Sequence, residues 1–390
     1  MVLQKELLKV LAKHLKWNKA RLACFVGLLL ALVLLKQTNL TQLSLAFAGK
    51  AKSESKYRRL QRFFQAVYFD YNAIARLIME MFGFYEMKYY LSLDRTNWKW
   101  GKKNINILTL AIVYKGTAIP IYWLILNKQG NSNQKERIAL LQRFIRQFGR
   151  QNILGVLGDR EFIGEQWRKW LTTVSIPYLI RVKENQLVIN RRGKAVPIRS
   201  LFSDLKVRKS RILRASRKVS EQQVWLSALR LDSKELLIVA GNQYFSSPFE
   251  IYGFRWEIEC LFQCLKGRGF HMEETRLVRY FRIKKMMALL AIGFCWAHKT
   301  GEWKQKAIKP LKTKTHGRLE KSIFRYGLDH LTEKLIHGFK EMKEILWSLI
   351  VFLYPPSLII ERDGNLVLLA NSNNEVWKIV VYRAKGYQFL

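Results

Sequence analysis

Acidic residues, prolines, cysteines and histidines are all scarce in this chain of 390 residues, and each shortage excludes something. Seven prolines beside a hydrophobic content of 49% argue against wholesale disorder, and they allow a large core and more than one domain. The 29 acidic residues face 68 basic ones, which leaves a formal net charge of +39. A positive field of this strength attracts phosphate backbones. The first predicted partner is therefore a nucleic acid, and the second is an anionic membrane surface.

The basic residues are spread along the chain rather than confined to a tail. They recur near the N-terminus (Lys50, Lys52, Lys56, Arg58, Arg59, Arg62), in the middle (Arg191, Arg192, Arg208, Arg211) and after residue 300 (Lys304, Lys306, Lys309, Lys312, Lys314). A single charge run most often forms only a solvated face. An excess over the whole length favours a protein that grips DNA along several surfaces.

The four cysteines do not have the pattern of a disulfide framework. Cys260 and Cys264 are one helical turn apart, and no histidine pair stands nearby at zinc-finger spacing. We expect reduced, structural thiols in a cytosolic protein. The six histidines are scattered and none needs a catalytic role, although His271 is a candidate for lying near DNA.

One apolar run, Ala23 to Leu35, follows a lysine-rich start and precedes Ala46-Phe47-Ala48, which mimics a signal cleavage site. The run has about 13 residues, whereas a membrane span needs about 20. Polar residues also separate it from the supposed cleavage site, and the charged leader is long. We therefore predict a buried helix in an N-terminal helical domain.

Residues 1 to about 82 have the periodicity of helices, with apolar side chains three and four residues apart. These are Leu7, Leu8, Leu11 and Leu15, and then Leu60, Phe63, Phe64 and Val67. Arg58, Arg59 and Arg62 are predicted to share one face of the second helix.

From about residue 88 the pattern changes to strands and helices in a mixed α/β order. We expect a strand over 89–93, a hairpin over 105–114 and 117–126 turning at Lys115-Gly116, a helix over 133–148, a strand over 153–157, a helix over 161–171 and a strand around 177–182. A β-rich insertion over 184–248, with alternating runs at 223–231 and 235–240, interrupts this order. Helices are expected over 252–266 and 277–298, then a lysine-rich segment after Gly301, a helix ending before Pro355-Pro356 and a hairpin turning at Asp363-Gly364-Asn365. The chain has no internal repeat, no low-complexity tract and no glycine loop of the kind that cradles phosphates.

Two aspartates, Asp94 and Asp159, are each predicted to follow an apolar strand. Strand ends are where such sheets place ligands, because the backbone there is held while side chains project into a crevice. An aspartate after a strand is more often a turn residue or a helix cap. The pair is informative because carboxylate oxygens are the hard ligands that Mg²⁺ requires.

A third acid, Glu259, shares one predicted helix face with other polar residues. At 100° per residue, Tyr252, Arg255, Glu259 and Lys266 lie in one stripe about 60° wide. The expected core face is formed by Phe254, Ile258, Leu261 and Leu265. An ordinary solvated face with an i,i+4 Arg–Glu pair is the alternative.

Together these motifs resemble the DDE insertion-sequence transposases, and within them the group with the Y-R-E-K helix signature. The motifs are Leu93-Asp94-Arg95-Thr96, Gly158-Asp159-Arg160-Glu161-Phe162, Tyr-x2-Arg-x3-Glu-x6-Lys at 252, 255, 259 and 266, and the helical lead-in Tyr57-Arg58-Arg59-Leu60-Gln61-Arg62-Phe63-Phe64. The resemblance covers roughly residues 40 to 330. It implies an α/β (α+β) fold: a ribonuclease-H-like catalytic core with a β-rich insertion and an N-terminal helical domain.

The implied domains are a helical DNA-binding domain over 1–85, a catalytic core over 86–183 and 250–303, the insertion over 184–249 and a basic C-terminal region over 304–390. The implied activity is cleavage of DNA at insertion-sequence ends, followed by joining of the 3′ hydroxyls to target DNA. Asp94, Asp159 and Glu259 would be the catalytic residues and would hold two Mg²⁺ ions, or Mn²⁺. The implied partners are the terminal inverted repeats, target DNA and a second copy of the chain, with no membrane, in the cytoplasm and nucleoid of a bacterial-type cell.

The resemblance also assigns DNA contacts. Tyr252, Arg255 and Lys266 would grip phosphates beside the cut, because a phenol, a guanidinium fork and a point charge suit that task. Arg160 and Arg95 lie beside the acids, where DNA contact and pairing with nearby carboxylates are equally plausible. Arg58, Arg59 and Arg62 suit phosphates better than bases. Trp225 is a candidate to stack a flipped base, although a core tryptophan is the commoner outcome.

Three other functions fit parts of the sequence. A ribonuclease-H-like nuclease would cut without joining, and a DNA-binding protein derived from a transposase would do neither. A membrane-surface protein is the remote third alternative, and it requires the helix over Ala23 to Leu35 to partition into bilayers.

Overall fold

The computed structural model describes residues 2–47, 49–315, 317 and 319–337, together with the strand segments 359–362, 365–368 and 382–383. The chain forms two compact units. The first contains Met1–Glu86, Gly267–Thr275 and Ala288–Leu390, and the second contains Met87–Lys266 and Arg276–Met287. Helix α10 has residues in both units.

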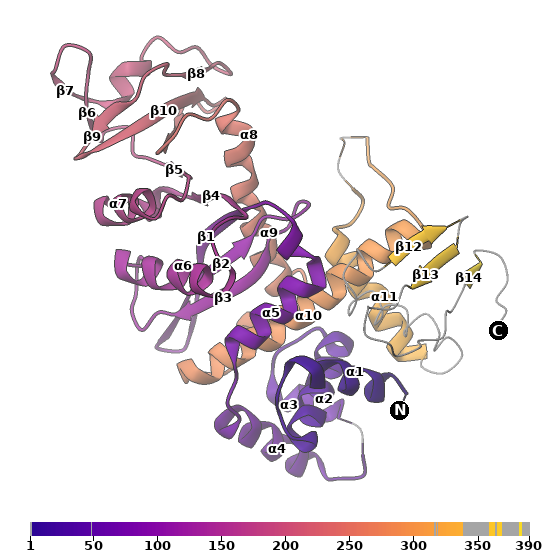
Figure 1. The fold of residues 1–390 in the computed structure, drawn as a ribbon. Coiled ribbons are helices and arrows are strands. Elements are labelled where there is room, and N and C mark those ends of the chain that lie inside the picture. Colours follow the sequence, from indigo (N-terminus) through magenta and orange to yellow (C-terminus); the bar gives the residue numbers. More distant parts are fainter. Residues whose placement is uncertain are drawn as a thin grey trace. The chain divides into compact units, whose positions relative to one another are not determined.

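Figure 1 shows the elements in sequence colours. The α-helices are α1 (Val2–His14), α2 (Lys19–Leu35), α3 (Leu40–Leu45), α4 (Ser53–Ala66), α5 (Tyr71–Phe82), α6 (Gln134–Phe148), α7 (Glu165–Thr173), α8 (Pro248–Gly253), α9 (Glu257–Leu265), α10 (Tyr280–Ala307) and α11 (Ile323–His337). The short 3-10 helices are η1 (Phe84–Glu86), η2 (Arg160–Phe162), η3 (Ile198–Phe202), η4 (Phe254–Trp256) and η5 (Met272–Glu274). The strands are β1 (Tyr89–Trp100), β2 (Lys103–Ile112), β3 (Ile119–Ile125), β4 (Ile153–Gly158), β5 (Tyr178–Arg181), β6 (Leu187–Ile189), β7 (Ala195–Pro197), β8 (Ser210–Ile212), β9 (Arg217–Val219), β10 (Gln222–Arg230), β11 (Leu236–Gly241), β12 (Ile359–Arg362), β13 (Asn365–Leu368) and β14 (Tyr382–Arg383).

The expected N-terminal helices are present as α1 to α5. The apolar positions that predicted them are buried, among them Leu7, Leu11, Leu60 and Phe64. Helix α2 starts at the Asn18 cap, whose side chain accepts a hydrogen bond from the backbone of Arg21. Helix α5 starts at a cap made by Asp70.

Helix α2 contains the apolar run and is a buried helix, as predicted. Its buried side chains are Leu22, Cys24, Phe25, Val26, Leu28, Leu29, Ala31, Leu32 and Val33. Within the described residues, no single helix is long and apolar enough to cross a membrane. Helices α1 and α2 pass that test only as a pair, by length and composition, and they are bent by 118°.

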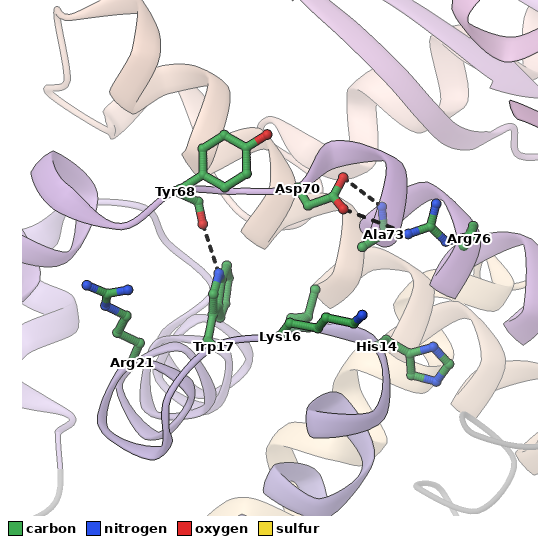
Figure 2. A pocket seen from close by; sticks show the side chains of 9 residues that line it. His14, Lys16, Trp17, Arg21, Tyr68, Asp70, Ala73 and Arg76 are labelled. Carbon is green, nitrogen blue, oxygen red and sulfur yellow. Dashed lines mark hydrogen bonds and ion pairs between the residues drawn. The ribbon is translucent and has the colours of Figure 1, made fainter. Parts of the chain in front are cut away.

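A cavity of about 330 Å³ lies in the first unit, between the α1–α2 connection and the segment that precedes α5 (Figure 2). Trp17 lines the cavity and donates a hydrogen bond of 2.8 Å from Nε1 to the carbonyl of Tyr68. Its basic lining residues are Lys16, Arg21 and Arg76, and its one carboxylate, that of Asp70, caps α5. It contains none of the acids that the motifs single out.

The second unit is built on a nine-stranded sheet with the order β3-β2-β1-β4-β5-β11-β10-β8, and β9 pairs with β10. Strands β1, β2 and β3 are antiparallel, whereas β4 is parallel to both β1 and β5. This is the ribonuclease-H-like core, so the predicted fold class is confirmed. The hairpin turn at Lys115-Gly116 is present, and both residues have positive φ angles.

The β-rich insertion extends the main sheet, because β11 pairs with the core strand β5 and β10 pairs with β11. The insertion also has its own apolar core, which includes Val188, Phe202, Val219 and Val224. Its short strands β6 and β7 form a separate two-stranded sheet. The insertion is therefore joined to the core sheet by backbone hydrogen bonds between strands β11 and β5.

Helices cover both faces of β1, as the alternation of its side chains shows. Tyr89 contacts Phe144 of α6 with ring centroids 6.1 Å apart, whereas the next residue, Tyr90, contacts Phe254 of η4 at 6.2 Å. Ser92 lies on the same face as Tyr90 and approaches the carbonyl of Arg255. Two residues further along, Asp94 must face the α8–α9 side.

Two predicted elements need correction. The strand predicted over 89–93 continues as β1 to Trp100, because after Leu93 it keeps pairing with β2. The helix predicted over 252–266 is three pieces, α8, η4 and α9. Phe254, expected in the core, is 42% exposed, since the tighter turn at η4 rotates it away from the face that buries Ile258 and Leu261.

The remaining boundaries differ less. The helix expected over 161–171 is divided into η2 and α7, and the helix expected over 277–298 is α10, which continues to Ala307. The four cysteines are free thiols. Strands β12 and β13 form the expected antiparallel pair, but residues 363–364 of its turn and the helix end before Pro355-Pro356 lie outside the described residues.

Candidate active site

Asp94 and Asp159 lie side by side because of the register between two parallel strands. The last pair of that ladder joins Leu93 to Gly158, so the two aspartates are the next residues on each strand. Leu157 packs in one cluster with Tyr252, which places the α8 side of β4 at residues 157 and 159. Both carboxylates therefore project toward α8 and α9 where the β1–β4 ladder ends.

Glu259 comes to the site from the first turn of α9, and Arg255 comes from η4. The guanidinium of Arg255 donates from Nη2 to Oε1 of Glu259 at 2.6 Å, and its Nη1 lies 3.7 Å from Oδ2 of Asp94. The i,i+4 pair considered as an alternative thus exists. It is not an ordinary surface pair, because Arg255 is 13% exposed and bridges two of the three acids.

Tyr252 is buried at the end of α8, beneath the same guanidinium. The guanidinium carbon of Arg255 lies 5.8 Å from the centroid of the Tyr252 ring, a cation–π distance. Burial raises the pKa of the Tyr252 phenol to about 12. Its hydroxyl therefore remains a neutral donor over the whole physiological range of pH.

The charge state of Asp94 is the most perturbed feature of the site. The pKa of Asp94 is raised to about 7, chiefly by burial and to a smaller extent by the nearby carboxylates of Asp159 and Glu259. A backbone hydrogen bond of 2.7 Å from Arg95 and the positive charge of Arg255 oppose the rise. One positive side chain therefore compensates only part of the negative charge that the three acids bring together.

Carboxylate oxygens are the ligands that divalent metals such as Mg²⁺ prefer. Here the carboxylates of Asp159 and Glu259 are close enough to Asp94 to raise its pKa by electrostatic repulsion. As the side chains stand, no group of three or more His, Cys, Asp and Glu residues within the described part of the chain is close enough to hold a metal. Arg255 occupies the position of a counter-charge between Asp94 and Glu259. The donor set fits a divalent cation that would replace Arg255 as the neutralising charge.

Lys266 ends α9 and turns toward the second half of β1. Its Nζ donates to the carbonyl of Asn97 at 3.4 Å and lies 5.9 Å from the centroid of the Trp98 ring. Trp98 is on the same face of β1 as Asp94, four residues along the strand. Lys266 therefore extends the site along β1 toward Trp98.

Arg95 forms a structural pair on the opposite face of β1. Its Nε donates to both carboxylate oxygens of Glu161 at 3.0 Å, and its Nη1 donates to Asn106 at 3.1 Å. Glu161 also accepts from the backbone and hydroxyl of Ser132. Burial raises the pKa of Glu161, but the hydrogen bonds from Arg95 and Ser132 outweigh burial and hold the pKa below its ordinary value. Of the two uses considered for Arg95, the structure shows carboxylate pairing.

We expect Glu161→Gln to lower the free energy of unfolding by about 3 kcal/mol, because it leaves the buried Arg95 without its counter-charge. Denaturant unfolding monitored by tryptophan fluorescence measures this loss. Glu165→Gln, at an exposed position in the first turn of α7, is the matched control and should change stability by less than about 0.5 kcal/mol. Equal stability of the two variants would contradict a structural role for Glu161.

Glu161 and Glu257 are the residues that sequence reasoning missed. Glu257 is buried and accepts from the backbone nitrogens of Tyr114 and Gly116, so it ties the β2–β3 turn to α9. Burial raises the pKa of Glu257, and those two hydrogen bonds oppose the rise. Glu161 belongs to the motif Gly158-Asp159-Arg160-Glu161-Phe162. Its partner Arg95 is 66 residues away, so no local sequence pattern could identify the pair.

The other predicted contact residues belong to other elements of the fold. Arg160 is 54% exposed, 3.7 Å from Glu235 of the insertion. Arg58, Arg59 and Arg62 are all exposed on α4 in the first unit. Trp225 is in β10, where its backbone pairs with Gly241, and its side chain is half-buried. His271 caps η5 in the first unit, with Nδ1 3.4 Å from Glu274.

A family model described as a transposase DDE domain matches residues 86–296, which is more than half of the chain. No curated protein matches the sequence. Among solved structures, the chain is similar to piggyBac transposase in a synaptic complex with hairpin DNA, with 9% sequence identity and a TM-score of 0.43. That alignment covers 91% of this chain and 84% of the other.

Proposed function

The chain belongs to the family of transposases with a DDE domain, and from this membership we propose that it cleaves DNA at the ends of an insertion sequence and joins the 3′ hydroxyls to target DNA. Transposition of DNA by cleavage and strand transfer is the activity of the family. The observation that supports the catalytic assignment is the adjacency of Asp94 and Asp159 with Glu259 on the same side of the sheet.

DDE transposases typically use divalent metal ions, and we propose that Asp94, Asp159 and Glu259 hold two Mg²⁺ or Mn²⁺ ions. When bound, the ions supply Lewis acidity for activating water and for stabilising the leaving 3′ oxygen. The residues of the chain provide the rest. The sheet fixes the two aspartates, and α9 presents Glu259 from a rigid element, which keeps the carboxylates within a productive geometry.

Arg255 has two tasks in this proposal. Before DNA and metal are bound, it neutralises Glu259 and Asp94, as its contacts at 2.6 and 3.7 Å indicate. With those carboxylates neutralised by bound cations, the guanidinium fork of Arg255 would be available to a phosphate beside the cut. The Tyr252 ring lies against the guanidinium of Arg255, and its phenol hydroxyl would donate a hydrogen bond to a phosphate oxygen. This division of labour suits the group with the Y-R-E-K signature, to which we assign the chain.

The N-terminal helices are proposed to bind the terminal inverted repeats, with Arg58, Arg59 and Arg62 on phosphates. Their exposure on α4 supports this use. We propose that two copies act together, one at each end of the element, in the cytoplasm and nucleoid of a bacterial-type cell. A nuclease without strand transfer is the rival, and it predicts cleavage without joined products.

The test is an assay on a labelled DNA fragment that carries the terminus of the element, with Mg²⁺ and a supercoiled target. We expect cleaved ends that expose a 3′ hydroxyl and then labelled target DNA. Both products should disappear when EDTA removes the metal and should return with Mg²⁺ or Mn²⁺. Cleavage without labelled target would favour the nuclease, and cleavage in EDTA would refute the metal assignment.

A further inference from the structure

A surface of cations and aromatic rings lies at the tip of the β1–β2 hairpin and has no role in the site described above. The hairpin contributes Trp100 and Lys103, and the segment that leads into α10 contributes Arg276, Arg279, Tyr280 and Phe281. These six residues are called the hairpin-tip surface, and all of them belong to the second unit.

Two cation–π contacts join the two segments of this surface. Nζ of Lys103 lies 4.6 Å from the centroid of the Tyr280 ring, and the guanidinium carbon of Arg276 lies 5.7 Å from the Trp100 ring. The start of α10 is also tied to the sheet, because Nε1 of Trp123 donates to the carbonyl of Lys284 at 3.0 Å. The surface is therefore a fixed arrangement and not a chance meeting of two loops.

The charge of the region is entirely positive. Residues 99–103 and 276–285 contain eight basic residues and no acidic residue, so nothing within these segments offsets the field. Within the described part of the chain, Lys103, Arg276 and Arg279 form no ion pair with a carboxylate. Such a field, without internal compensation, is complementary to a polyanion.

The aromatic rings add a second kind of contact. Trp100 is 38% exposed and Phe281 is 40% exposed, although large apolar side chains of this kind usually bury themselves. Exposed rings beside cations are the combination that binds nucleic acid, because bases stack on rings while cations hold the phosphates.

The surface continues the catalytic site along β1. Asp94, Trp98 and Trp100 share one face of the strand, and Lys266 stands over Trp98 between the acids and the tip. Six residues at about 3.3 Å each separate Asp94 from Trp100 by about 20 Å. That length corresponds to about six phosphates of one DNA strand.

From this geometry we infer that the hairpin-tip surface binds the backbone of DNA that extends from the catalytic acids, independently of sequence. The inference rests on the proposed DNA-cleaving function and deepens it. The surface holds the DNA beside the cut through phosphate contacts from Lys103, Arg276 and Arg279. Trp100 provides a stacking platform at its far end.

The test compares two triple variants of the full chain in fluorescence anisotropy with a labelled duplex that lacks the terminal repeat. The first is Lys103→Gln, Arg276→Gln and Arg279→Gln. The control removes the same charge from exposed positions of the same unit, with Lys135→Gln and Arg146→Gln on α6 and Lys169→Gln on α7. We expect the first variant to bind at least about tenfold more weakly, with a salt slope of log K reduced by about 3, and the control to change the slope by less than 1.

Circular dichroism verifies that both triple variants are folded. Trp100→Ala provides an independent measurement, because we expect it to lower the affinity for a single-stranded DNA probe several-fold. Equal binding by the two triple variants would overturn the inference while leaving the proposed function intact. A wild-type chain that binds no DNA would refute the proposed function itself. If the Lys103, Arg276 and Arg279 triple variant kept DNA binding but lost binding to anionic phosphatidylserine vesicles, the surface would be assigned to a membrane. That result would overturn the inference as well.

Discussion

End cleavage is expected to fall by at least about 10³-fold when Glu259 is replaced by glutamine, because the change removes one anionic ligand from a charge-stabilised transition state. Glutamine has the shape of glutamate, and its Oε1 can still accept the hydrogen bond that Arg255 donates now. The fold and the basic surface should therefore be unaffected. DNA binding should be retained within about twofold, since no phosphate-binding cation is altered.

Glu250→Gln is the matched control for this experiment, because Glu250 is exposed on α8, nine residues before Glu259. Cleavage by the control should equal that of the wild type. Full cleavage by Glu259→Gln would refute the assignment of Glu259 as a metal ligand. Loss of both cleavage and DNA binding would instead indicate a structural defect, which thermal unfolding of the variant would reveal.

Asp94→Asn is expected to stabilise the metal-free protein while it abolishes cleavage. Burial raises the pKa of Asp94 from its ordinary 3.8 to about 7, so the folded state keeps a proton that the unfolded chain releases. Ionised Asp94 therefore costs stability, by up to about 4 kcal/mol above pH 7, at 1.36 kcal/mol per pH unit. Asparagine carries no charge and avoids this cost.

The sign of the effect gives it a distinctive dependence on pH. Well below the unfolded pKa of 3.8, Asp94 is protonated in both states, so its ionisation no longer contributes to the difference in stability between variant and wild type. Between pH 4 and 7 the wild type should lose stability relative to Asp94→Asn, and above pH 7 the difference should be constant. Thermal unfolding in EDTA from pH 4 to 8 measures it, and a difference that does not vary with pH would contradict a raised pKa for Asp94.

Added Mg²⁺ provides the complementary measurement. If the carboxylates hold the metal, Mg²⁺ should stabilise the wild type at pH 8 and should stabilise Asp94→Asn less. An equal shift in both proteins would show that the ion binds elsewhere. A bound cation would favour the ionised form of Asp94 and so offset the cost that burial imposes on it in the metal-free protein.

Much of the core fold could be predicted from local patterns. The apolar runs before Asp94 and Asp159 indicated strands, and the helical spacing over 133–148 indicated α6. The helix over 252–266 was predicted as one piece because a fixed 100° step ignores the tighter turn at η4. That error placed Phe254 in the core when it is exposed.

The sequence by itself determined the identity and order of the three acids, the spacing of Tyr252, Arg255 and Lys266, and a positive field that demands a polyanion. Only the tertiary structure decided how these charges are paired. In the folded chain Arg255 lies between Glu259 and Asp94, and Arg95 pairs with Glu161. The insertion pairs with the core strand β5. The reason is physical: burial and proximity depend on which elements pack against β1. Arg255 and Asp94, which meet there, are 161 positions apart in sequence.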